Sequence, residues 1–178
     1  MLDTSTFIGL RDALAILTLF KTGIRIKTLG DLKENNVDFQ NKVLNLEGSI
    51  MKNHNYLKLP LDDQLIELYK VLIEQNNKIR TYYKQENDFL FITMKGKSIN
   101  GKSTNNAISK QLHKYARRYD LPNINAHAIR RTYAKNLYER GANVALISKA
   151  LGHSDLAVTT QYLDLEVNEV AQHLREFL

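Results

Sequence analysis

Four side chains near the C-terminal end of the chain have the types needed to act on a phosphate group. They are His127, Arg130, His153 and Tyr162. Arginine presents a planar fork of donors that fits phosphate oxygens, histidine can transfer a proton near neutral pH, and an activated tyrosine can be a covalent nucleophile. Together these groups favour a reaction at a phosphate, and none of them needs a metal.

Taken singly, each of these residues has a simpler interpretation. His127 and Arg130 are three residues apart and share one face of a helix, as many surface or capping pairs do. Gly152 followed by His153 also fits a helix stop and a structural histidine. Most tyrosines fill cores with their hydroxyl groups bonded. Only the combination of all four favours a reaction site.

The composition narrows the choice of partners. The 178 residues include 25 Lys and Arg against 19 Asp and Glu, a formal charge of +6, which favours a polyanion such as nucleic acid. Mild basicity is common among soluble proteins, so this charge alone is weak support. The absence of cysteine excludes disulfides, thiolate catalysis and Cys-based zinc sites. No apolar run is long enough to span a bilayer and no signal peptide is recognisable, so we expect a cytoplasmic protein with no membrane contact.

The elements that must position these residues begin with a buried helix. Apolar spacing predicts a helix over residues 7–22 that stops at Gly23, followed by a short helix over 24–32. Alternation and turn residues then predict a small antiparallel sheet from residues 37–39, 43–47, 49–51 and 56–59, closed by Pro60. Helical spacing returns over 62–77.

The second half of the chain is predicted to be mainly helical. We expect a loop over 80–87, a short buried strand over 89–92, an exposed loop over 95–103, and a helix from Ser103 to about residue 119. Four further helices are expected over 128–140, over 143–151, after a cap at Asp155, and over 167–177. The fold class is therefore mixed, mainly α with a small antiparallel β-sheet. The helix ending near residue 119 carries cations on its outer face, namely Lys110, Lys114, Arg117 and Arg118.

Four separated motifs resemble those of the tyrosine recombinases, also called the phage integrase family. The segment HAIRRTYAKNLYERG contains the family's His-x-x-Arg motif, and ISKALGHSDLAVTTQYL contains Leu-Gly-His with Tyr162 nine residues after His153. Thr22-Gly23-Ile24-Arg25 matches the upstream arginine motif. Lys52, in MKNHNYLKLPL, matches the family's hairpin lysine. The match spans residues 7 to about 165, nearly the whole chain.

The resemblance implies a role for each matching residue. Tyr162 would attack a DNA phosphodiester and form a 3′-phosphotyrosyl link. Arg25 and Arg130 would stabilise the charge of the transition state. His127 would assist proton transfer at Tyr162, and His153 would donate a hydrogen bond to the phosphate.

Two positions need separate comment. Lys52 would be the general acid that protonates the leaving 5′ oxygen, although Lys58, Lys95 and Lys97 also lie on or near predicted hairpins and loops. Thr28 stands where the family usually has a carboxylate three residues after its first arginine. Threonine can still form a hydrogen bond, but it cannot offset the charge of the cationic cluster.

The resemblance also implies an architecture and a set of partners. The fold would be that of the tyrosine recombinase catalytic domain, a DNA breaking-rejoining enzyme, over residues 1–178. The family's N-terminal core-binding domain is absent, so we expect a fragment of a longer integrase. The partners would be a double-stranded recombination site, other protomers in a tetramer on paired sites with exchange of a C-terminal helix over 167–178, and an excisionase or accessory factor. No cofactor, metal or ATP is expected.

Two other functions remain open from the sequence. One is a type IB topoisomerase-like enzyme that nicks and reseals DNA with the same chemistry. The other is a DNA-binding regulator without catalysis, since LISKALGHSDLAVTTQYL has the rhythm of a helix-turn-helix. A pure regulator would not need Arg25, Lys52 and Tyr162 together.

Overall fold

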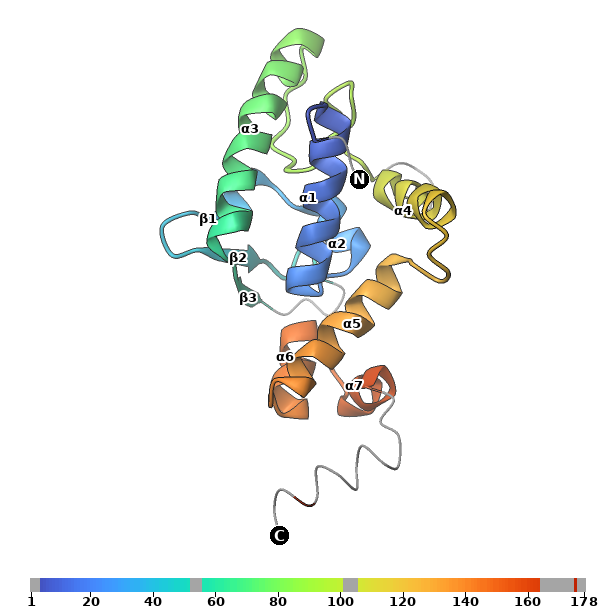
Figure 1. The fold of residues 1–178 in the computed structure, drawn as a ribbon. Coiled ribbons are helices and arrows are strands. Elements are labelled where there is room, and N and C mark those ends of the chain that lie inside the picture. Colours follow the sequence, from blue (N-terminus) through green and yellow to red (C-terminus); the bar gives the residue numbers. More distant parts are fainter. Residues whose placement is uncertain (1–3, 52–55, 101–105, 164–174, 176–178) are drawn as a thin grey trace.

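α1, Phe7–Thr22, lies at the centre of the molecule and contacts most of the other helices (Figure 1). The structure is a computed structural model that describes residues 4–51, 56–100, 106–163 and 175. After α1 come α2 (Ile26–Asp31), a 3-10 turn η1 (Glu34–Asn36), strands β1 (Val37–Asp38), β2 (Val43–Leu46) and β3 (Leu57–Pro60), and helices α3 (Asp63–Tyr83), α4 (Ala107–Arg118), α5 (Ala126–Glu139), α6 (Val144–Leu151) and α7 (Leu156–Leu163). The predicted mixed, mainly helical fold with a small antiparallel sheet is confirmed.

Local signals fix both ends of α1. The Thr6 side chain accepts a hydrogen bond from the Gly9 N–H and caps the first turn. Gly23 ends the helix in the left-handed conformation, at φ 63°, and its N–H reaches the Leu19 carbonyl. A side chain at that φ would be strained, so glycine is the natural stop. The predicted bounds of this helix are confirmed.

The sheet is a three-stranded antiparallel meander in the order β1-β2-β3. Pro60 is the last residue of edge strand β3, where its missing N–H costs no ladder hydrogen bond. The strand predicted over 49–51 is wrong. That segment turns instead, because the N–H groups of Ile50 and Met51 donate to the carbonyls of Glu47 and Gly48. The described part of the connection between β2 and β3 is therefore a turn, which brings Ile50 and Met51 toward α2.

α3 is longer than its sequence pattern predicts. The helix continues to Tyr83, so the loop expected over 80–87 begins only at Lys84, the left-handed C-cap. Arg80 explains the difference. Its guanidinium is buried and donates to Glu34 Oε1 and to the Phe89 carbonyl, each at 2.5 Å. Arg80 thus occupies an inward-facing position of α3. The spacing of apolar residues cannot reveal such a position when the residue there is polar.

Residues 90–92 are buried as predicted and Phe89 is half-buried, but the segment is not part of the sheet. It makes only isolated bridges, from Phe89 to Lys33 and from Ile92 to Ser98. Two later helix starts also differ from the predictions. α4 is capped by Asn106 instead of Ser103, and α5 begins at Ala126 after the cap Asn125. α6 and α7 follow the predictions, whereas the helix expected over 167–177 lies outside the described residues apart from residue 175.

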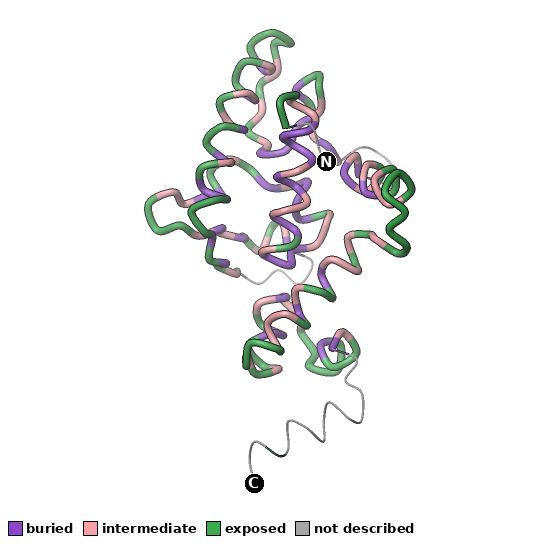
Figure 2. Tube along the Cα trace, in the orientation of Figure 1, coloured by how far each residue is buried: buried purple, intermediate pink, exposed green. Residues whose placement is uncertain are grey.

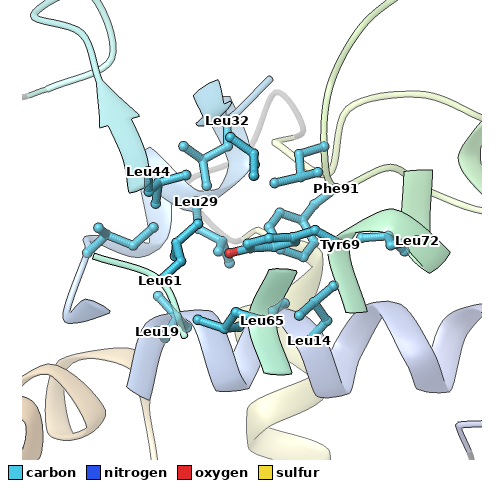
Figure 3. Close-up of a cluster of buried hydrophobic side chains, with 14 of the residues drawn as sticks. Leu14, Leu19, Leu29, Leu32, Leu44, Leu61, Leu65, Tyr69, Leu72 and Phe91 are labelled. Carbon is cyan, nitrogen blue, oxygen red and sulfur yellow. The ribbon is translucent and has the colours of Figure 1, made fainter. Parts of the chain in front are cut away.

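The main core lies between α1, α3 and the sheet (Figure 3). Tyr69 of α3 and the leucines around it are fully buried, and its hydroxyl lies 2.8 Å from Thr18 Oγ1. A second, smaller cluster joins the C-terminal helices through Ala134, Ile147, Leu151 and Leu163. Buried residues follow the inner faces of both clusters, and exposed residues follow the outer faces (Figure 2). The C-terminal helices therefore pack as a small group attached to the main core through α5.

A buried polar network joins α1 to α4. The Arg11 guanidinium pairs with its neighbour Asp12 at 2.6 Å and donates to the Ile92 carbonyl at 3.1 Å. The Tyr115 hydroxyl of α4 donates to the other Asp12 oxygen at 3.2 Å. The Asp12 carboxylate thus accepts from two sides, and this contact holds α4 against α1.

No helix among the described residues is long and apolar enough to cross a membrane.

Candidate active site

Arg130 lies between the carboxyl ends of two helices. It is 5% exposed, and its Nη1 and Nη2 donate to the carbonyls of Gly23, at the end of α1, and Leu151, at the end of α6, each at 2.5 Å. Carbonyls at helix C-termini lack partners within the helix and carry partial negative charge. They therefore stabilise a buried guanidinium. Burial and the repulsion of Arg25 lower the pKa of Arg130 to about 10, so the group stays charged at neutral pH.

Arg25 faces Arg130 across a small pocket. It is the N-cap residue of α2, and the pocket lining also includes Thr28 and Met51. The buried Thr28 hydroxyl donates to the Ile50 carbonyl at 3.3 Å. Among the described residues, neither arginine has a carboxylate within ion-pair distance. The pair therefore has excess positive charge, which a phosphate could neutralise.

Tyr162 and His127 form the second half of the cluster. Tyr162 is on α7 and His127 is in the first turn of α5, and the phenol oxygen lies 3.2 Å from His127 Nδ1. The two rings meet edge to face with centroids 5.0 Å apart. Tyr162 is half-buried and His127 is exposed. The His127 imidazole is thus within hydrogen-bond distance of the Tyr162 hydroxyl and can accept its proton.

His153 links the two halves. It follows Gly152, the left-handed cap that ends α6, and its ring also meets the Tyr162 ring edge to face at 5.0 Å. Its Nε2 lies 3.1 Å from Arg130 Nη2, and its Nδ1 lies 2.9 Å from Thr159 Oγ1. Burial, then the charges of Arg130 and Arg25, lower the pKa of His153 to about 4. The imidazole is therefore neutral at physiological pH.

The structure thus brings together five of the six residues predicted from the sequence: Arg25, His127, Arg130, His153 and Tyr162. Lys52 lies outside the described residues, so its place near this cluster stays a prediction.

Three participants were not predicted from the sequence. Two are the carbonyls of Gly23 and Leu151, which are backbone groups and leave no side-chain signal. The third is Thr159, whose position three residues before Tyr162 on a helix places both on one face.

A metal site is not apparent among these groups. Within the described residues, no three His, Asp or Glu side chains gather closely enough to hold a metal ion. The chain has no cysteine. The groups that converge on the pocket are donors with positive or neutral charge, which suit an anion.

Known proteins are similar in sequence to this chain over most of its length. The sequence model of the phage integrase family matches residues 1–169. The transposase from transposon Tn916 of Enterococcus faecalis is 28% identical over 164 residues, covering 83% of this chain and 40% of the transposase. Tyrosine recombinase XerA of Pyrococcus horikoshii is 28% identical over 168 residues, covering 94% of this chain and 54% of XerA. The chain thus spans about half the length of these relatives, or less.

Solved structures share the fold. A crystal structure of XerA recombinase superposes with a TM-score of 0.76 at 18% identity and covers 94% of this chain and 57% of that one. XerH site-specific recombinase, bound to its difH substrate in a pre-cleavage complex, gives a TM-score of 0.73 at 24% identity over 93% of this chain and 46% of that one. The fold is that of tyrosine recombinase catalytic domains. The family match, the order of the motifs and this fold agree, and the chain belongs to the phage integrase family.

Proposed function

We propose that this chain carries out site-specific DNA cleavage and rejoining, in integration or excision of a mobile element, with Tyr162 as the nucleophile. The observation that carries the proposal is the Tyr162 hydroxyl, 3.2 Å from His127 Nδ1 and next to the Arg130–His153 pair. A nucleophile, a proton acceptor and donors for a phosphate thus meet in one cluster. Relatives named as recombinases and transposases support the same reaction class.

In the proposed step, the Tyr162 oxygen attacks phosphorus as the bond from phosphorus to the 5′ oxygen breaks. The phenol gives its proton to His127. Arg25 and Arg130 donate to the non-bridging oxygens, whose charge grows in the transition state. His153 donates a further hydrogen bond to the phosphate. The products are a 3′-phosphotyrosyl ester and a free 5′ hydroxyl, which attacks the ester when the strand is rejoined.

Lys52 is the proposed general acid for the 5′ oxygen. The test is a substrate whose leaving 5′ oxygen is replaced by sulfur, because a thiolate leaves without being protonated. Lys52→Ala should fail on the normal duplex and regain cleavage on the sulfur substrate. Lys58→Ala, which removes the exposed lysine of β3, should cleave both. The acid would be another residue if Lys52→Ala cleaves neither the normal nor the sulfur-substituted duplex, or if it cleaves the two equally well.

We propose that the cycle needs neither metal nor ATP. The two guanidinium groups meet the phosphate charge, and the phosphotyrosyl ester keeps the energy of the broken bond. Adduct formation should therefore be unchanged by EDTA and by removal of nucleotides. Loss of adducts in EDTA, restored by Mg²⁺, would contradict this part of the proposal.

Covalent trapping tests the nucleophile. The chain is incubated with a pool of nicked duplexes, and protein–DNA adducts are resolved on denaturing gels. Tyr162→Phe should bind DNA and form no adduct, whereas Tyr82→Phe, which alters a tyrosine that is 79% exposed, should form adducts normally. Adducts that persist in Tyr162→Phe would refute the assignment.

The same assay separates the alternatives. A DNA-binding regulator would form no adduct with either protein and would lose nothing on Tyr162→Phe. A type IB topoisomerase-like enzyme would form the adduct but would relax supercoiled DNA without joining strands from two duplexes. A recombinase should join them, and sequencing the trapped DNA identifies its site.

The outer face of α4 is the proposed contact with the DNA backbone. Lys110, Lys114, Arg117 and Arg118 are all exposed there, and the buried contact with α1 fixes the position of this helix. Lys114→Ala should weaken binding to all duplexes alike and reduce the salt dependence of binding by about one counterion. Lys78→Ala on α3 should change neither quantity.

Exchange of a C-terminal segment between protomers is the proposed basis of a tetramer on paired sites. Apart from residue 175, the segment 167–178 lies outside the described structure, but its sequence has an apolar stripe at Val167, Val170, Ala171 and Leu174. An open groove of about 600 Å³ along α1 and α3 offers an apolar surface, with Phe20 44% exposed. Deleting 167–178 from the full-length protein should abolish recombination and leave single-site binding intact; unchanged recombination would refute the exchange.

A further inference from the structure

The two hydrogen bonds of His153 fix its tautomer in the DNA-free protein. Arg130 Nη2 carries only donor hydrogens, two of them, and it faces two acceptors: the Leu151 carbonyl and His153 Nε2. Nε2 must therefore accept. A neutral imidazole with an accepting Nε2 carries its proton on Nδ1, so Nδ1–H donates to Thr159 Oγ1 at 2.9 Å.

Thr159 is built into the fold at this point. It is fully buried in α7, one turn before Tyr162, and its Oγ1 is the contact of the His153 Nδ1 among the described residues. A hydroxyl can accept a hydrogen bond or donate one, depending only on how its O–H is rotated. Thr159 can therefore bind Nδ1 whether or not that nitrogen carries a proton.

A phosphodiester needs the opposite state of Nε2. Its oxygens only accept hydrogen bonds, so His153 must present Nε2–H to bind them. Forming an imidazolium would put a third cation beside Arg25 and Arg130, while the diester brings a single negative charge. Among the described residues, the other groups that contact the ring, Tyr162 and Thr159, bring no negative charge. Moving the proton from one nitrogen to the other leaves the charge of the ring unchanged and costs less.

We propose that Thr159 is a positioning residue that lets His153 change tautomer when the phosphate binds. In the free protein Nδ1–H donates to Thr159, and Nε2 accepts from Arg130. When the diester takes the Arg130 donor, the ring gives up its Nδ1 proton to solvent and takes one from solvent at Nε2. The Thr159 O–H then rotates to donate to Nδ1. The inference rests on the proposed function, because it needs a phosphate at this site.

Nitrogen NMR tests the tautomer directly. The full chain is labelled with ¹⁵N-histidine, and the His153 signal is assigned by its loss in His153→Gln. At neutral pH the free chain should show protonated Nδ1 and bare Nε2. Saturating dimethyl phosphate, a monoanionic diester, should reverse this pattern. Protonated Nε2 in the free chain, or no reversal on binding, would overturn the inference.

Matched variants test the hydroxyl. Thr159→Ser keeps a group that accepts and donates and should form adducts within about threefold of the natural rate, whereas Thr159→Val, of nearly equal shape, should be slower by roughly tenfold to a hundredfold. DNA affinity should not change. Thr160→Val alters the exposed neighbour and serves as the control. A Thr159→Val rate equal to that of the natural chain, or a Thr159→Ser rate as low as that of Thr159→Val, would overturn the role.

The proposed function and the tautomer change can be refuted separately. If no Tyr162-dependent adduct forms on any DNA, the proposed function fails, but the tautomer of the free chain can still be measured. If adducts form normally and free His153 carries its proton on Nε2, the function stands and this inference is refuted.

Discussion

Gly23→Ala should both destabilise the fold and disturb the active site. Gly23 adopts a left-handed conformation at φ 63°, and a Cβ built on it would lie 2.2 Å from Cδ1 of the Tyr133 ring. Carbon atoms in contact prefer separations of about 3.5–4.0 Å, so the ring must move by more than ~1 Å. Tyr133 is three residues from Arg130 on α5, and Arg130 donates to the Gly23 carbonyl itself. The substitution therefore acts at both ends of this hydrogen bond.

The expected loss has two parts. An alanine in the left-handed region costs about 1–2 kcal/mol, and an extra carbon in a packed site costs about 1–3 kcal/mol more. The free energy of unfolding should thus fall by roughly 2–5 kcal/mol, which corresponds to a melting temperature lower by roughly 5–15 °C for a chain of this size. Adduct formation should also fall, because displacing the Tyr133 ring moves α5 and with it the Arg130 guanidinium.

Gly141→Ala is the matched control. Gly141 also has positive φ, at 86°, but no atom lies within 4 Å of a Cβ built there. It should lose only the backbone part, about 1–2 kcal/mol. Urea unfolding followed by circular dichroism measures both variants. Tyr133→Ala, which removes every side-chain atom that the added Cβ would meet, should reduce the cost of Gly23→Ala toward that of Gly141→Ala. Equal losses for the two alanine variants in the natural background would refute the steric argument.

Two further predictions concern charge. Asp12→Asn removes the charged partner of the buried Arg11 and should lower the free energy of unfolding by about 3–5 kcal/mol. Glu74→Gln breaks an exposed pair with Lys78, which water and salt screen, and should leave the urea midpoint nearly unchanged. Similar urea midpoints for both variants would contradict the burial argument. The pKa of His153 is about 4 in the folded protein, below its ordinary value of 6.5, so the unfolded chain takes up a proton first as pH falls. Stability should therefore decrease from pH 6.5 toward 4 more steeply in the natural chain than in His153→Gln, and parallel curves of urea midpoint against pH would show that His153 does not contribute.

The bounds of several elements could be read from local sequence. α1 ends at Gly23 and α6 ends at Gly152 because both glycines take left-handed caps. The side chain of Asn143 caps the start of α6, and that of Asp155 caps the start of α7. Such signals act within one helical turn, so one sequence is enough to find them. The order and spacing of the motifs likewise carry the family resemblance without any tertiary information.

Contacts between distant segments decided the rest. From the sequence alone, Arg80 is predicted to lie in a loop. In the structure it lies in a helix, because Glu34, 46 positions away, and the Phe89 carbonyl accept hydrogen bonds from its buried guanidinium. The turn after β2 likewise has the sequence pattern of a strand, because its apolar residues face α2 and the pocket beside it. Hydrophobic pattern reports burial, but it does not say which partner buries a residue or whether a polar group finds one.

The active site divides in the same way. The sequence by itself determined which chemical groups are present, because Arg25, His127, Arg130, His153 and Tyr162 are recognisable by type and spacing. Their state was decided by the tertiary structure. Two helix ends, far apart in the chain, supply the carbonyls that hold Arg130, and Arg130 and Thr159 together fix the proton of His153. Hydrogen-bond direction and pKa depend on what surrounds a group in space, and only folding brings those surroundings together.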